Sequence, residues 1–245
     1  MSGRKEFLER IAKALGRVPG SPVETRSPGL AIPELGPVMP PIEPANLIPK
    51  FEEELEKVSG HAHRVASRPE LTEILLPLLR SYGTKRVVIS RNPLLAHFGA
   101  ARRLQELGIE VTVWPSGRDE PSEPASAQRF REEAFSAEVG ITGVDWVLAE
   151  SGTLVLSSLT EGAQLASLAP PVHVALYRRS HVLGSLEEVL ERLPDLGDPS
   201  APAPGRSIVF VTGVSRTADI EQILIRGVHG PRELHAILVE DSCLT

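Results

Sequence analysis

From residue 46 onward, short apolar runs rich in β-branched residues alternate with segments of helical periodicity. The expected strands cover residues 61–66, 85–90, 109–114, 144–149, 153–157, 173–177, 208–212 and 236–240. The expected helices cover residues 51–58, 69–82, 93–107, 126–137, 162–168, 185–194 and 217–225. Such alternation is typical of a mostly parallel sheet that is buried on both faces. We therefore predict an α/β fold, a three-layer α/β/α arrangement with one antiparallel hairpin around residues 150–152.

A proline-rich stretch precedes this pattern. Nine of the 22 prolines lie between residues 19 and 49. Proline lacks the backbone N–H donor and clashes with helical turns, so we expect an extended arm or a disordered linker there. Ahead of it, an apolar helical face predicts a short helix that ends near Gly16, with face residues Phe7, Leu8, Ile11, Ala12 and Leu15. That helix packs either on its own domain or, as a swapped arm, on a partner such as a second copy.

The expected organisation is an N-terminal helix and arm over residues 1–46 and a single α/β domain over residues 47–245. The 26 Lys and Arg against 32 Asp and Glu leave a net charge of −6, which disfavours nucleic-acid binding. No apolar run reaches the roughly 20 residues that cross a bilayer, and the first residues lack a secretory signal. We expect a soluble, cytoplasmic protein that does not bind membranes.

A single cysteine, Cys243, stands near the end of the chain. One thiol excludes a disulfide framework and a four-thiolate iron–sulfur or zinc site. His61 and His63 are two positions apart, so both would lie on the same face of a strand, and no third ligand is nearby in the sequence. We therefore expect no metal and no cofactor held by this chain alone.

The densest polar run, TGVSRTADIE at residues 212–221, follows an expected strand and leads into an expected helix. Thr217 is suited to cap that helix, and Asp219 and Glu221 complement its dipole. Ser215, Arg216 and the free N–H groups of the helix start are predicted to hold a carboxylate or phosphate. In the alternative, this is a capped helix without a ligand, with Arg216 paired to one of the two acids.

Two further segments carry candidate residues. His229 lies between glycines in GVHGPRELH, where it serves either acid–base chemistry or the anchoring of the loop. Arg232, in the same segment, steers anions or only solvates the surface. Glu150 follows the strand WVLA and is a candidate base or nucleophile, although glutamate is also common in turns. Asp145 is expected to accept a backbone hydrogen bond or to charge a strand edge.

Three stretches carry a resemblance to a known family. They are GITGVDWVLAESGTLVLSS at 140–158, LAPPVHVAL at 168–176 and VTGVSRTADIEQILIRGVHGPRELHAILVED at 211–241. On these residues the chain resembles the lactate-utilisation protein C family, also called the LUD-domain or YkgG-like family. The family's characteristic positions map onto Glu150, Gly152, Thr153, Ser215, Arg216, Thr217, Asp219, Glu221, His229, Gly230 and Pro231. Two departures are Val214, where relatives usually have proline, and residues 160–164, which lack an arginine that relatives often carry.

The resemblance implies a fold like that of phosphosugar isomerases and CoA transferases. It also implies a role in the oxidation of L-lactate to pyruvate beside two iron–sulfur partner proteins. In the first hypothesis the chain is a non-redox subunit that binds a small carboxylate or stabilises those partners. In the second it is a stand-alone isomerase or transferase for a phosphorylated or CoA-linked molecule, with Glu150 as base and Arg216 holding the anion. In the third it is an interaction module that docks through its N-terminal helix.

Overall fold

The computed structural model describes residues 2–14, 16, 40–114, 124–162, 164–193, 207–218 and 224–243. They belong to two units, Met1–Pro41 and Ile42–Thr245. The first unit holds helix α1 (Ser2–Ala14), which confirms the N-terminal helix, and its apolar Phe7 and Ile11 are exposed. Most of the proline-rich arm lies outside the described residues. None of the described helices combines the length and apolar character needed to cross a membrane.

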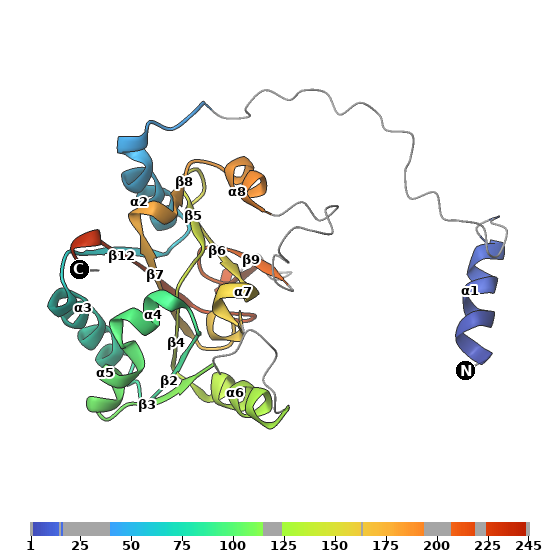
Figure 1. The fold of residues 1–245 in the computed structure, drawn as a ribbon, viewed down its shortest axis with the longest axis horizontal. Helices are drawn as coiled ribbons and strands as arrows, with labels where there is room; N and C mark the ends of the chain where they lie inside the picture. Colours follow the sequence, from blue (N-terminus) through green and yellow to red (C-terminus); the bar gives the residue numbers. More distant parts are fainter. Residues whose placement is uncertain are drawn as a thin grey trace. The chain divides into compact units, whose positions relative to one another are not determined.

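A six-stranded sheet forms the centre of the second unit (Figure 1). Its strands, in spatial order, are β1 (His61–Val65), β12 (Glu233–Val239), β7 (Val172–Arg178), β4 (Val139–Thr142), β2 (Arg86–Ile89) and β3 (Glu110–Val113). Every neighbouring pair is parallel. Apolar side chains are buried on both faces of this sheet, as parallel sheets require. The predicted fold class is confirmed.

Helices α3 (Arg68–Ser81), α4 (Pro93–Phe98) and α5 (Ala100–Glu106) cover one face. Their leucines pack on Val87, Ile89 and Ile141 of the sheet. The single helix expected over residues 93–107 was wrong, because Gly99 adopts a left-handed conformation (φ 60°) that breaks it into two.

The opposite face carries helices α2 (Leu47–Lys57) and α6 (Pro124–Ser136) together with a second sheet. The second sheet has the order β8 (Val182–Leu183), β5 (Trp146–Leu148), β6 (Thr153–Ser157) and β9 (Ile208–Thr212). Strands β5 and β6 are antiparallel, which confirms the predicted hairpin. Shorter elements are η1 (Pro44–Asn46), α7 (Ser158–Glu161), η2 (Gln164–Ser167), η3 (Arg179–His181), α8 (Leu186–Arg192) and η4 (Asp241–Cys243). Part of the third layer is thus a sheet rather than helices.

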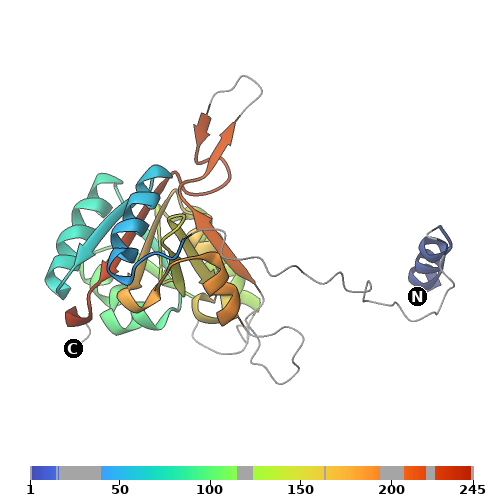
Figure 2. The same cartoon turned by 90° about the horizontal axis from the view of Figure 1, so that it is seen from above.

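Two expectations are corrected in this half of the chain, and one strand was not expected. The helix expected over residues 217–225 is wrong: β10 (Arg216–Ala218) and β11 (Leu224–Arg226) pair as an antiparallel hairpin. This hairpin extends from the body in Figure 2, and residues 219–223 lie outside the described part. The helix expected over residues 162–168 is the 3₁₀ turn η2, preceded by α7. Strand β4, in the middle of the sheet, was not foreseen.

Candidate functional site

The turn between α2 and β1 lies at the amino-terminal edge of the central sheet. Ser59 in this turn has φ 65°, the one positive value at a non-glycine position in the described ranges. Strand β9 ends against the turn, because Val214 N donates to Val58 O (3.4 Å). A Cβ on Gly213 would lie 2.3 Å from Val58 O, so only glycine permits this approach. Two segments far apart in sequence are therefore locked together around Ser59.

Two arginines of the β10–β11 hairpin meet at this turn. Arg216 and Arg226 are cross-strand neighbours. The Nη2 of Arg216 donates to Ser59 Oγ over 2.9 Å, and the Nη2 of Arg226 approaches the same oxygen to 3.4 Å. We call Ser59, Arg216 and Arg226 the Ser59 cluster. Sequence reasoning singled out Arg216 but missed its two partners, which only the tertiary fold brings to it.

The loop before β12 is fastened to the same region through the backbone of Ser215. Ser215 N donates to Pro231 O (2.8 Å), and Gly227 N donates to Ser215 O (2.9 Å). Arg232 N donates to Pro171 O (2.9 Å). The side chains of His229 and Arg232 are exposed. The structure thus brings the second candidate segment beside the first, with His229 open to solvent.

The helix start predicted at Thr217 is absent from the structure around that residue. Thr217 lies within β10 and faces Ile225 across the hairpin. The helix-dipole argument for an anion at this point therefore fails, and any anion must be held by side chains. Asp219 and Glu221 lie outside the described residues.

The tip of the β5–β6 hairpin packs tightly on α2. Gly152 has φ 65°, and a Cβ there would lie 2.3 Å from Leu55 N. Thr153 Oγ1 bonds to Thr212 Oγ1 and to Ser151 Oγ, both over 2.8 Å. These contacts give Gly152 and Thr153 a packing role, and they continue the second sheet toward the Ser59 cluster.

The side chain of Glu150 bonds to the backbone at the start of α8. Its Oε1 accepts from Leu186 N (2.7 Å) at the start of α8, and its own N donates to Gly184 O (3.0 Å). Glu188 accepts from Gly184 N (2.7 Å). Within the described contacts, no hydrogen bond links Glu150 to the Ser59 cluster. The carboxylate that sequence reasoning chose as a base is thus bound to the backbone at the start of a helix.

A second polar region, which sequence reasoning missed, surrounds Glu161. This side chain is fully buried at the end of α7 and accepts from Ser90 Oγ, Asn92 Nδ2 and Gly143 N (3.1 Å). Burial raises the pKa of Glu161 to about 7, against the lowering effect of these donors. Ser90 and Gly143 directly follow β2 and β4, so Glu161 lies at the carboxyl ends of parallel strands, where α/β folds commonly bind ligands.

Asp145 lies close to this buried acid. It accepts from Ser157 N (2.7 Å) and from Thr160 Oγ1 (2.9 Å), and burial raises the pKa of its carboxyl. The backbone contact confirms the expected role of Asp145. The sequence carried little signal for Glu161, because its partners come from two distant strands.

Three histidines stack at the start of β1 and β12. His61 and His63 both lie against His235, with ring centroids 5.0 and 5.4 Å away. His63 Nε2 is 3.1 Å from His235 Nδ1, and Tyr82 OH is 3.3 Å from His235 Nε2. Burial lowers the pKa of His235 to about 3. His235, which is distant in the sequence, thus joins the two histidines of β1. Among the described residues, no group of three or more His, Cys, Asp and Glu side chains is arranged to hold a metal.

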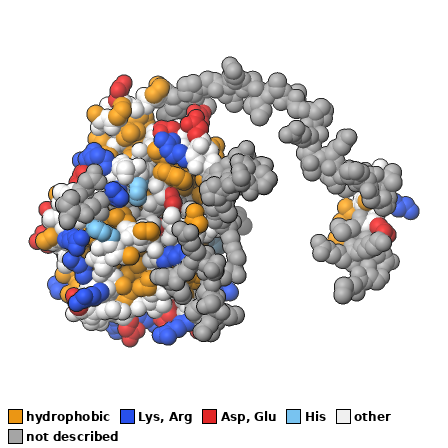
Figure 3. Space-filling view, viewed as in Figure 1, with side chains coloured by type: hydrophobic (Ala, Val, Ile, Leu, Met, Phe, Trp, Pro, Cys, Tyr) orange, Lys and Arg blue, Asp and Glu red, His pale blue; other side chains and the backbone are white. Residues whose placement is uncertain are grey.

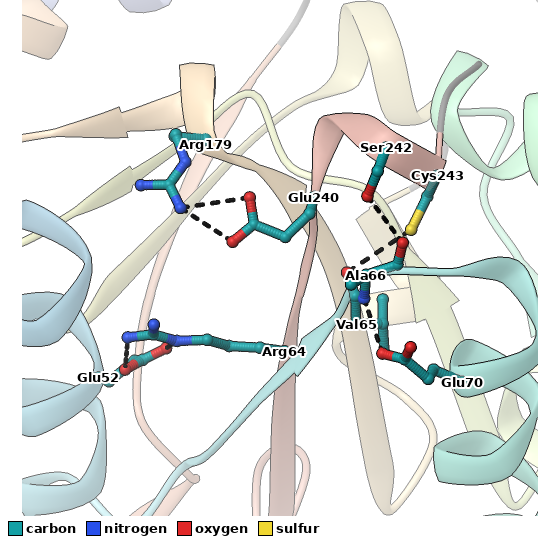
Figure 4. A network of polar contacts seen from close by, with 9 residues as sticks. All are labelled: Glu52, Arg64, Val65, Ala66, Glu70, Arg179, Glu240, Ser242 and Cys243. Carbon is teal, nitrogen blue, oxygen red and sulfur yellow. Dashed lines mark hydrogen bonds and ion pairs between the residues drawn. The ribbon is translucent and has the colours of Figure 1, made fainter.

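The lone cysteine lies at the opposite, carboxyl-terminal edge of β1 and β12 (Figure 4). Cys243 is buried, its Sγ lies 3.6 Å from Val65 O, and burial raises the pKa of the thiol. Of the charged groups drawn around it, Arg64 pairs with Glu52 and Arg179 with Glu240, while Glu70 accepts a hydrogen bond from Ala66 N (2.8 Å). On the face shown in Figure 3, basic and acidic side chains are interspersed.

The architecture and these polar regions define a three-layer α/β protein with candidate sites at both edges of its parallel sheet. The LUD domain family model matches residues 48–239, and the chain belongs to this family. Lactate utilization protein C of Halalkalibacterium halodurans is 29% identical over 238 residues, covering 97% of this chain and 98% of the relative. Uncharacterized protein YkgG of Escherichia coli K12 is 29% identical over 257 residues, covering 98% and 100%.

A solved structure supports the fold. The crystal structure of a DUF162 family protein from Deinococcus radiodurans matches with a TM-score of 0.55 at 24% identity. The match covers 81% of this chain and 99% of that chain. At this identity the likeness concerns the fold alone.

Proposed function

We propose that this chain is a lactate-utilisation protein that supports the oxidation of L-lactate to pyruvate as a non-redox subunit. The observation that carries the proposal is the near-full-length similarity to relatives named Lactate utilization protein C, at 29% identity over 97–98% of this chain. The oxidation releases two electrons and two protons, and iron–sulfur partner proteins would take the electrons.

The cysteine count supports this division of labour. Iron–sulfur clusters are commonly held by four thiolates, and this chain has one cysteine, which is buried against Val65. The sequence also lacks a glycine-rich dinucleotide fingerprint. The chain's own contribution would be to bind a small carboxylate or to hold the partners together.

Growth on L-lactate tests the proposal. In a host without another lactate dehydrogenase, deletion of the gene should abolish growth on L-lactate, and the full chain supplied in trans should restore it. A tagged chain should also retain iron–sulfur proteins during purification from the same host. Undiminished growth of the deletion strain would overturn the proposed role.

One observation favours a second function, a stand-alone isomerase or transferase on a phosphorylated or CoA-linked small molecule. Burial raises the pKa of Glu161 to about 7 at the carboxyl ends of β2 and β4, a value suited to acid–base catalysis near neutral pH once a substrate reaches this fully buried carboxyl. Glu150, the other candidate base, instead accepts a hydrogen bond from Leu186 N.

A substrate screen decides this second function. The purified chain would be assayed against sugar phosphates and acyl-CoAs, alongside the variants Glu161→Gln and Glu150→Gln. Turnover that only Glu161→Gln removes, at an unchanged melting temperature, would assign the base to Glu161. If wild type neither turns over nor is thermally stabilised by any of these compounds, the enzyme hypothesis falls.

A further inference from the structure

The Ser59 cluster contains two positive charges that, within the described part of the chain, have no negative partner. Among the described residues, neither Arg216 nor Arg226 forms an ion pair, and both donate to the hydroxyl of Ser59. Five other arginines of the body pair with carboxylates, in the pairs Arg64–Glu52, Arg86–Glu138, Arg102–Glu106, Arg179–Glu240 and Arg192–Glu188. Both side chains are exposed, so water screens part of their mutual repulsion, and an anion beside them would reduce it further.

The hydroxyl of Ser59 completes a set of donors. Its oxygen has two lone pairs, which face the N–H groups of Arg216 and Arg226. Its own O–H is then left to donate. Each guanidinium carries five N–H donors and uses one of them here, so further donors on both arginines remain for a ligand.

The position of this hydroxyl is fixed by the fold. Ser59 is held in a left-handed conformation that L residues rarely adopt. The close approach of Gly213 and the hydrogen bond from Val214 N hold the preceding residue, Val58. Ser59 is the left-handed residue that ends α2: Gly60 N donates to Leu55 O and Ser59 N donates to Glu56 O, both over 2.9 Å, so the helix terminus itself fixes this hydroxyl.

We propose that Ser59, Arg216 and Arg226 form a binding site for a small oxyanion, either the carboxylate of a small organic acid or a phosphate group. Planar guanidinium forks match both kinds of group, and charge-assisted hydrogen bonds make such contacts strong. The two arginines come from neighbouring strands of a short hairpin, so the ligand sits at the base of that hairpin, beside the turn after α2. The site does not depend on the lactate role proposed above.

Titration of the full chain at low ionic strength tests the site. Inorganic phosphate, L-lactate and pyruvate would each be titrated into wild type by isothermal calorimetry. We expect one saturable site, weakened about tenfold or more by Arg226→Gln, because a charge-assisted contact is lost. Ser59→Gly keeps the left-handed turn available, removes the hydroxyl and should also weaken binding. Arg102→Gln, an exposed arginine already paired with Glu106, is the matched control and should bind like wild type.

The outcomes separate clearly. Binding of phosphate alone assigns a phosphorylated ligand, and binding of L-lactate or pyruvate alone assigns a carboxylate. Equal affinity of Arg226→Gln and Arg102→Gln, or no binding of any of the three anions by wild type, would overturn the site. Growth on L-lactate is a separate readout, so the failure of one proposal is distinguishable from the failure of the other.

Discussion

Glu161 and His235 are two buried ionisable side chains whose protonation the fold alters strongly. Burial favours the neutral form of each, so it raises the pKa of Glu161 to about 7 and lowers the pKa of His235 to about 3. Both then titrate differently in the folded and unfolded states, over pH ranges that overlap. Their effects on stability have opposite signs.

For Glu161, the folded pKa of about 7 exceeds the ordinary value of 4.5. The stabilising effect of its bound proton is complete below pH 4.5 and is lost as the pH rises through 7. From pH 5 to pH 8 the wild type should therefore lose about 2 kcal/mol relative to Glu161→Gln, whose amide does not titrate. Urea unfolding of both proteins at each pH measures this difference, and parallel pH profiles would contradict it.

For His235, the folded pKa of about 3 is below the ordinary value of 6.5. The unfolded chain therefore takes up the proton first, and stability is lost as the pH falls from 6.5 toward 3. Between pH 7 and pH 5 the wild type should lose about 1 to 2 kcal/mol relative to His235→Gln. The exposed His229→Gln variant is the control and should follow the wild type in the same urea series. If His229→Gln and His235→Gln give the same profile, the burial effect is refuted.

At the scale of elements, local pattern predicted most of the parallel sheet and its flanking helices. It failed where the apolar run of a strand was interrupted or too short to show its period. Strand β4 has glycine and threonine at positions 140 and 142, which interrupted the apolar run. The segment around Thr217 has too few residues for its pattern to separate a helix from a strand, and pairing with β11 decides the outcome.

Gly140 shows why β4 carries a residue that weakens strand propensity. A Cβ there would lie 1.8 Å from Ala166 O. The backbone of β4 therefore contacts the backbone of η2 directly, which only a residue without a side chain permits. Gly140→Ala should destabilise the protein by about 2 to 3 kcal/mol, because the two elements must separate. In Gly230→Ala the nearest atom is 3.4 Å from the new Cβ, and we expect less than about 1 kcal/mol. Chemical denaturation compares them, and equal losses would contradict this packing role.

At the scale of the whole molecule, the two polar regions lie at opposite edges of the parallel sheet. Ser215 and Arg216 were recognisable in the sequence, because they stand in a dense polar run after a strand. Ser59 and Arg226 were not recognisable, because Ser59 lies 157 positions from Arg216 and 167 positions from Arg226. No local sequence pattern links residues so far apart. The site around Glu161 was not predicted for the same reason, because its hydrogen-bond partners Ser90 and Asn92 are distant in the sequence. The family resemblance, in contrast, was recognisable from the sequence, and the LUD domain match over residues 48–239 confirms it.

The decisive measurement concerns the proposed division of labour between this chain and iron–sulfur partner proteins. The rate of L-lactate-dependent reduction of an artificial electron acceptor would be measured for the complex purified through a tag on this chain, for the partners alone and for this chain alone. The complex should reduce the acceptor, the partners should be much slower without this chain, and this chain alone should be inactive. Reduction of the acceptor by this chain alone, or an unchanged rate in its absence, would contradict a non-redox supporting role.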